Sequence, residues 1–326
     1  METVANLFLF MENGKIKSLG LAAHFVEFEN DEQIANFLKQ NVERDSATAT
    51  RHPLPVGLIK SGLGVDAKDG LPYEYFSYLS RTGKALYLFE KLLQDINAPA
   101  NPFVCYTPIV ENKPQFDSTT HANPLVDPII HSNEFGGSLR IDWLASYTTD
   151  GRLNIHDLLA DDFTEAIKLL YAHKHYVAAM KLILSFMDTL AYLEYDDIPK
   201  NFQTWLSTFA NLKPVQITPE ELWEFRNSML HMTNPLSRKV QAGSVTRLYF
   251  YVSTDAKDVS IDRETGTKMF SFNALYDALL EALENWGKTF TGNLPKQLLF
   301  IQRYDTIMSE ARIGKLAQRP NPKSAK

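Results

Sequence analysis

The period of the apolar residues changes near Asp161, and this change limits the possible folds more than any other feature of the chain. Before that point, short apolar runs alternate with polar residues at the two-residue period of strands. After it, apolar residues recur every three or four positions, which is typical of packed helices. A chain of 326 residues can hold two domains. We therefore predict an α+β fold, with a mixed α+β domain over residues 1–155 and a mainly helical domain over residues 156–312.

The first domain is expected to open with a β-hairpin. Residues 5–11 and 16–28 alternate in polarity, and Asn13-Gly14 between them accept the positive φ angles of a tight turn. The other elements expected are a helix capped by Asn30, a strand over 54–60, a helix over 83–96, a strand over 103–110, a long irregular connection over 111–137 and a second hairpin over 138–158 about Asp150-Gly151.

The helical domain contains one strong helix start. Thr218 can cap a helix, Pro219 stands where its missing N–H costs nothing, and Glu221 completes a capping box. We predict helices over 163–172, 176–193, 202–209, 219–232, 272–290 and 294–313, with a small strand pair inserted over 245–271. The tail over 313–326 is basic and is predicted to be disordered.

Composition excludes several classes of protein. The longest apolar candidate, Tyr176–Leu193, is interrupted by Lys181, Ser185 and Asp188, so we expect no membrane partner. The short apolar run at the N-terminus has no positive flank and does not resemble a signal peptide. Cys105 is the one cysteine, which excludes intramolecular disulfides and cysteine-rich metal sites and fits a reducing compartment. We therefore place the protein in the cytoplasm.

The distribution of charge is uneven. A formal net charge of −6 argues against a general nucleic-acid coat. From Arg226 to Thr254, however, there is no Asp or Glu, while Arg226, Arg238, Lys239 and Arg247 are basic. This segment could hold an anion such as RNA. The alternative is a chance gap in acidic residues on a solvated face.

Arg226, Asn227 and His231 lie on the helix that starts at Pro219. Arg226 and His231 are about 140° apart and about 7.5 Å apart along the axis of an α-helix, so they do not share one stripe. Asn227 and His231 do share one, and Glu224 and Ser228 are expected on this polar side.

Arg226 instead lies at the edge of the apolar sector, where a charged group needs a partner. Asp188 lies at the edge of the apolar stripe of the helix over 176–193. These placements predict a semi-buried ion pair between Arg226 and Asp188, whether or not catalysis also occurs.

The order of a helix over Tyr176–Asp188, a short helix, and a helix carrying Arg226-Asn227 and His231 resembles the HEPN superfamily over residues 160–305. HEPN domains are antiparallel helical bundles defined by an arginine, usually a polar neighbour, and a histidine four to six intervening residues later. Arg226-Asn227 and His231 match this pattern with four intervening residues. The resemblance implies a homodimer that completes a cleft, and no cofactor. Residues 1–155 resemble no family known to us.

The resemblance also implies a metal-independent endoribonuclease of a bacterial defence or toxin type. His231 would be the general acid or base, Arg226 would hold the phosphate, Asn227 would orient the histidine or the phosphate, and Asp188 would fix the arginine. The alternative is a non-catalytic HEPN module that dimerises or binds a nucleotide or RNA. In that case the ion pair is structural, and His231 forms a local hydrogen bond.

Two further groups of residues resemble sites in composition only. Four polar residues of the irregular connection match no metal-binding motif, so no metal is predicted: Asp117, His121, Asp127 and His131. Three consecutive aromatic residues could stack on bases, but at least one of them should belong to the core of an alternating strand: Tyr249, Phe250 and Tyr251.

Overall fold

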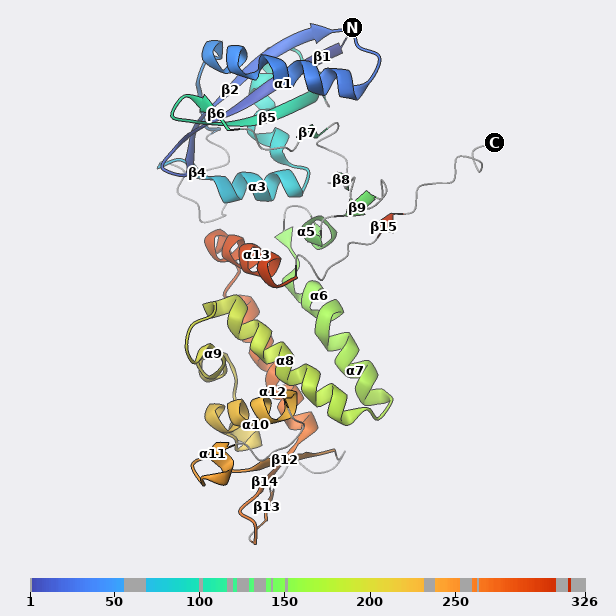
Figure 1. Cartoon of the computed structure of the whole chain (residues 1–326), viewed down its shortest axis with the longest axis vertical. Coiled ribbons are helices and arrows are strands. Elements are labelled where there is room, and N and C mark those ends of the chain that lie inside the picture. Colours follow the sequence, from blue (N-terminus) through green and yellow to red (C-terminus); the bar gives the residue numbers. More distant parts are fainter. Residues whose placement is uncertain are drawn as a thin grey trace, which may run out of the picture. The chain divides into compact units, whose positions relative to one another are not determined.

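The computed structural model describes residues 2–55, 69–99, 102–115, 120–121, 129–131, 139–141, 143–149, 152–231, 238–252, 260–262, 264–308 and 316–317. The chain forms two compact units (Figure 1). Unit 1 contains Met1–Leu153, Gly292–Leu298 and Met308–Lys326, and unit 2 contains Asn154–Thr291 and Leu299–Ile307. The first part of the chain carries a sheet and the second is mostly helical, so the fold is α+β as predicted.

The sheet of unit 1 is built on the predicted hairpin. β1 (Glu2–Glu12) and β2 (Lys15–Val26) pair antiparallel, and Asn13 and Gly14 adopt φ angles of 50° and 73° in the turn. β5 (Phe103–Val110) pairs in parallel with β1, as a strand with the predicted bounds. Short strands extend the sheet: β3 (His52–Pro53), β4 (Leu71–Pro72), β6 (Lys113–Pro114) and β7 (Thr120–His121). Cys105 is a buried residue of β5, and burial raises the pKa of its thiol.

The helices of unit 1 follow the predictions only in part. α1 (Asp31–Thr48) is capped as expected, because the Gln33 N–H donates to the Asn30 side chain at 3.0 Å. α3 (Tyr73–Arg81) was not predicted. The prediction of a single helix over 83–96 was wrong. The segment forms a 3-10 turn, η2 (Ala85–Leu88), and a short helix, α4 (Glu90–Asp95). They are separated at Phe89, whose ring is fully buried and whose backbone leaves the helical region.

The hairpin predicted over 138–158 is also largely wrong. The segment contains β9 (Leu139–Ile141), α5 (Trp143–Ser146), the two-residue strands β10 (Thr148–Thr149) and β11 (Arg152–Leu153), and α6 (Ile155–Leu159). β9 pairs instead with β8 (Ile129–His131) and with β15 (Leu316–Ala317). Most of the strand predicted over 54–60, the turn at Asp150-Gly151, Asp117, Asp127 and most of the basic tail lie outside the described residues.

A buried polar cluster lies between α1 and the sheet. Asp45 of α1 accepts hydrogen bonds from His24 Nε2 at 2.6 Å, from Asn6 Nδ2 at 2.9 Å and from the guanidinium of Arg44 at 3.0 and 3.2 Å. The Asp45 side chain is 4% exposed. Two apolar clusters cover the same face of the sheet, one containing Val4, Ile34, Leu38, Phe103 and Cys105 and the other Phe8, Phe10, Val42 and Ile109.

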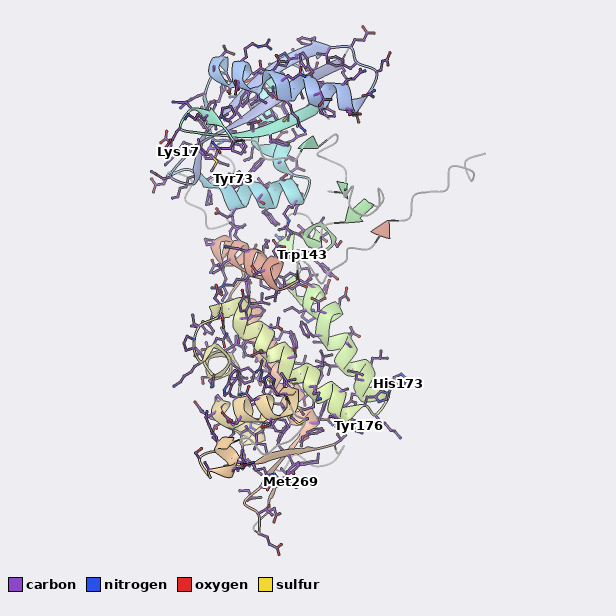
Figure 2. The ribbon with its side chains drawn as sticks, viewed as in Figure 1. Lys17, Tyr73, Trp143, His173, Tyr176 and Met269 are labelled. Carbon is purple, nitrogen blue, oxygen red and sulfur yellow. The ribbon has the colours of Figure 1, made fainter. Side chains whose placement is uncertain are left out.

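Unit 2 is arranged around α8. Its helices are α6, η4 (Ala160–Thr164, one π turn), α7 (Glu165–Ala172), α8 (Tyr176–Tyr195), α9 (Asn201–Phe209), η5 (Lys213–Val215), α10 (Pro219–His231), α11 (Arg238–Gln241) and α12 (Phe272–Lys288). α13 (Leu294–Met308) is divided between the units, and its residues Leu299–Ile307 belong to unit 2. α8 contacts α7, α9, α10 and α12. Four residues of its predicted apolar stripe are fully or almost fully buried: Met180, Ile183, Met187 and Leu190. His173 and Tyr176, on either side of the α7–α8 turn, are labelled in Figure 2.

By length and composition alone, α8 could cross a membrane. Half of its apolar window is buried within the fold, however, as in the core helix of a soluble protein. The structure is therefore compatible with a soluble protein.

Three short strands are inserted between α11 and α12. They are β12 (Leu248–Tyr251), β13 (Ser260–Ile261) and β14 (Lys268–Ser271), in the order β12-β14-β13 (Figure 1). β12 and β14 pair in parallel, so the predicted strand pair is a three-stranded sheet rather than a simple hairpin. Phe250 packs against Phe270 and Phe272, which confirms that one of the three aromatic residues belongs to the core.

Candidate functional site

The helix α10 starts at the predicted capping box. The Thr218 N–H donates to Glu221 Oε2 at 2.8 Å, and the Glu221 N–H donates to Thr218 Oγ1 at 3.1 Å. Glu221 is buried, and Lys268 Nζ of β14 donates to both of its carboxylate oxygens at 2.8 Å. The first turn of α10 is therefore held by the inserted sheet as well as by its own cap.

The pKa of Glu221 gives a prediction about acid stability. Burial alone would raise it, but hydrogen bonds from Lys268, Thr218 and Thr246 and the charge of Lys268 outweigh burial and hold the pKa below its usual 4.5. A carboxyl whose pKa is lower in the folded state stabilises the fold above pH 4.5, and this stabilisation is lost as the pH falls below that value. Glu221→Gln should therefore flatten the acid limb of a plot of melting temperature against pH.

The exposed neighbour Glu220 gives the matched control, because Glu220→Gln should leave the acid limb unchanged. Melting curves recorded by circular dichroism through the acid range would test the prediction. If the melting temperature of Glu221→Gln fell with pH as steeply as that of the unmodified chain, the prediction would be contradicted.

Arg226 forms the predicted ion pair with Asp188. Arg226 Nη2 donates to Asp188 Oδ2 on α8, and Arg226 Nη1 donates to Asn227 Oδ1 at 2.9 Å. The guanidinium also lies over the ring of Trp223, 5.0 Å from its centroid. The Arg226 and Asp188 side chains are 17% and 34% exposed. Asp188, Asn227 and Trp223 thus fix the orientation of the arginine at the surface between α8 and α10.

His231 is the last described residue of α10, and its side chain is exposed. The hydrogen bonds of Arg226 go to Asp188 and Asn227 and not to His231, as expected for positions about 7.5 Å apart along a helix. Within the described part of one chain, the structure thus brings Asp188, Arg226 and Asn227 together but leaves His231 apart.

The prediction that Glu224 and Ser228 lie on the polar side of α10 was wrong. They are 6% and 3% exposed, whereas Asn227 is half-buried and His231 is exposed. Glu224 accepts a hydrogen bond from Lys239 Nζ at 2.7 Å, and Ser228 Oγ donates to the Glu224 carbonyl at 2.9 Å. α10 contacts α8, α9 and β12, so tertiary contacts override the helical pattern.

The candidate anion-binding residues differ in their partners. The charge of Lys239 is paired with Glu224, which precedes the acid-free segment, and that of Arg226 with Asp188. The Arg247 guanidinium donates to Tyr249 Oη and lies 4.6 Å from the centroid of that ring. The side chain of Arg238 lies outside the described residues. Acids from elsewhere thus neutralise part of a segment that looks strongly basic in the sequence.

Two contributors to the site were not predicted. Trp223 stands three residues before Arg226, a spacing that places two side chains together on a helix, so the sequence did contain a signal for this contact. Lys268 is 47 residues from Glu221, and no local pattern indicates that pair. Among the described residues, no group of three or more His, Cys, Asp or Glu side chains is placed to hold a metal ion.

No family model, curated protein or solved structure matches the chain. The resemblance to HEPN domains therefore rests on the residues of α8 and α10.

Proposed function

We propose that unit 2 is a HEPN-type domain and that the protein is a metal-independent endoribonuclease, of a defence or toxin type, that acts as a homodimer in the cytoplasm. The proposal rests on the orientation of Arg226 and the exposure of His231, the two motif residues. Arg226 is held in one orientation by Asp188 and Asn227, and the His231 side chain on the same helix is exposed. A reactive site needs such a fixed cation and an accessible imidazole. The lone buried thiol of Cys105 fits a reducing compartment.

The reaction proposed is cleavage by the neighbouring 2′-hydroxyl. Its oxygen attacks phosphorus as a base removes its proton, the bond from phosphorus to the 5′ oxygen breaks, and the leaving oxygen takes a proton from an acid. The products are a 2′,3′-cyclic phosphate and a 5′-hydroxyl. Imidazole titrates near neutral pH and suits either proton transfer, so His231 is assigned one of them. Arg226 stabilises the charge on the phosphate, and Asn227 and Asp188 hold the guanidinium.

A homodimer accounts for two features of this arrangement. The reaction needs both a base and an acid, and one chain contributes a single motif histidine. His231 is also separated from Arg226 within its own chain. A second copy with its α10 facing the first would supply the second imidazole and bring it to the phosphate. Size-exclusion chromatography with light scattering measures this state directly.

A second candidate function is a non-catalytic HEPN module that dimerises or binds a nucleotide or RNA. The Arg226–Asp188 pair favours a structural role for this arginine, because a neighbouring carboxylate cancels much of the charge that would attract a phosphate. In this case the Arg226–Asp188 pair stabilises the packing of α8 on α10.

The test is cleavage of an end-labelled single-stranded RNA in EDTA. We expect the full chain to produce fragments ending in cyclic phosphate, and His231→Ala to reduce the rate by at least about a hundredfold. His173→Ala and His175→Ala are matched controls, because both replace exposed histidines of unit 2 outside the site. Equal activity in His231→Ala, purified free of contaminants, would rule out the catalytic role. RNA binding without cleavage by the unmodified chain would favour the second candidate.

A further inference from the structure

The inserted sheet of unit 2 has one face turned toward the helices and one turned away. Leu248 is buried, and Phe250 packs against Phe270 and Phe272, so these alternate residues of β12 define the inner face. Side chains alternate along a strand, which places Tyr249 on the opposite face. The cation–aromatic contact between Arg247 and Tyr249 puts Arg247 on that face as well.

We call this the Arg247–Tyr249 face. Met269 of β14, labelled in Figure 2, is paired with Tyr249 across the two strands. By alternation along β12, Tyr251 shares the face with Tyr249. Tyr249 is 38% exposed even though it contacts Arg247. An aromatic ring remains open to solvent here, beside a fixed guanidinium.

The charge of Arg247 differs from that of the other basic residues nearby. Arg226, Lys239 and Lys268 each pair with a carboxylate. No carboxylate of the described residues pairs with Arg247, whose guanidinium contacts the ring and the hydroxyl of Tyr249. Its positive charge is therefore available to an anion. The guanidinium covers one face of the Tyr249 ring, so a flat apolar group would stack on the opposite face.

We propose that the Arg247–Tyr249 face binds a single-stranded RNA segment, with one unpaired base stacked on Tyr249 and a neighbouring phosphate held by Arg247. Base stacking on an aromatic side chain combined with a cation that neutralises the backbone is the usual chemistry of single-strand binding. An unpaired base is required because a duplex hides the faces of its bases. This inference rests on the proposed function for its choice of RNA and assigns that substrate a second contact surface.

Fluorescence anisotropy of a labelled single-stranded RNA of twelve nucleotides tests the proposal. All binding is measured with the full chain carrying His231→Ala, so that the probe is not consumed. Tyr249→Ala and Tyr249→Leu should each weaken binding by about tenfold, since the stacking ring is lost. Tyr249→Phe keeps the ring and should weaken binding much less. Tyr87→Ala, which removes an exposed tyrosine of unit 1, is the matched control and should change nothing.

The dependence of RNA affinity on salt concentration distinguishes a direct phosphate contact of Arg247 from a structural role, which would leave that dependence unchanged. Arg247→Ala should reduce the slope of log affinity against log salt by about 0.7, the value for one phosphate contact on a single strand. Tyr249→Leu should leave that slope unchanged. Circular dichroism melting curves check that each variant is folded.

The outcomes separate this inference from the proposed ribonuclease. If the Tyr249 variants lose binding and the unmodified chain cleaves no RNA, the binding face is supported and the proposed ribonuclease activity is ruled out. Cleavage that depends on His231, combined with affinity and salt slope that are the same in all Tyr249 and Arg247 variants, overturns the binding face and keeps the nuclease. Equal binding to a duplex of the same sequence would overturn the stacking proposal.

Discussion

Replacing Lys268 by methionine is expected to lower the free energy of unfolding of unit 2 by about 3–5 kcal/mol. The Lys268 side chain is 15% exposed, and its Nζ donates to both carboxylate oxygens of Glu221 and to the Gln216 carbonyl. Methionine has a similar length and keeps the apolar contacts of the stem, but it leaves a buried carboxylate without a counter-charge. The penalty should therefore be that of an unpaired buried charge.

Urea unfolding followed by tryptophan fluorescence measures this loss. Three of the four tryptophans, Trp205, Trp223 and Trp286, belong to unit 2, so the signal reports mainly on that unit. Lys168→Met is the matched control, because its pair with Glu165 is exposed to solvent and its loss should change the free energy of unfolding far less. The double variant Lys268→Met with Glu221→Gln should recover part of the loss, since no unpaired charge remains. Equal effects of the two lysine variants would contradict the prediction.

The features that could be predicted from the sequence are those fixed by neighbours in the chain. The turn at Asn13-Gly14 and the cap at Thr218 depend on a few adjacent residues, and both were predicted. The Arg226–Asp188 pair was also predicted, although its members are 38 residues apart. Two amphipathic helices each place a charge at the edge of an apolar stripe, so the partners followed from two local patterns.

The features that were missed depend on contacts between distant segments. Glu224 and Ser228 belong to the polar side of α10 by periodicity, but both are buried, and Glu224 accepts a hydrogen bond from Lys239 of α11. The break at Phe89, whose ring is fully buried, divides a regular apolar repeat, and periodicity does not indicate such a break. Satisfied polar groups can be buried at little cost, and periodicity does not indicate which ones will be satisfied.

The polar cluster around Asp45 in unit 1 also depends on contacts between distant segments. Nothing near Asp45 in the sequence indicates that Asn6 and His24, 39 and 21 residues away, will donate hydrogen bonds to it. Its position on α1 matches the buried stripe of Ile34, Leu38 and Val42, which favours an apolar residue. A carboxylate at such a position is tolerated because three side chains supply its hydrogen bonds.

Asp45→Ala is accordingly expected to destabilise unit 1 by about 3–5 kcal/mol, a loss similar to that for a broken buried pair. The change removes the acceptor of His24 Nε2 and one of the two acceptors of the Asn6 amide, which also donates to the Leu38 carbonyl at 3.0 Å. It also leaves a space beside the neighbouring apolar clusters. In the full chain, hydrogen exchange of the β1 amides should accelerate by about two to four orders of magnitude, because each 1.4 kcal/mol is about tenfold.

Two variants separate the buried contacts of Asp45 from its exposed one. Arg44→Ala removes a side chain that is 64% exposed, and exchange in β1 should change by less than about fivefold. Asp45→Asn keeps the volume and one carbonyl oxygen, so its effect should fall between those of the two alanine variants. If Arg44→Ala accelerated exchange as much as Asp45→Ala, the surface ion pair rather than the buried hydrogen bonds to Asn6 and His24 would stabilise α1 on the sheet.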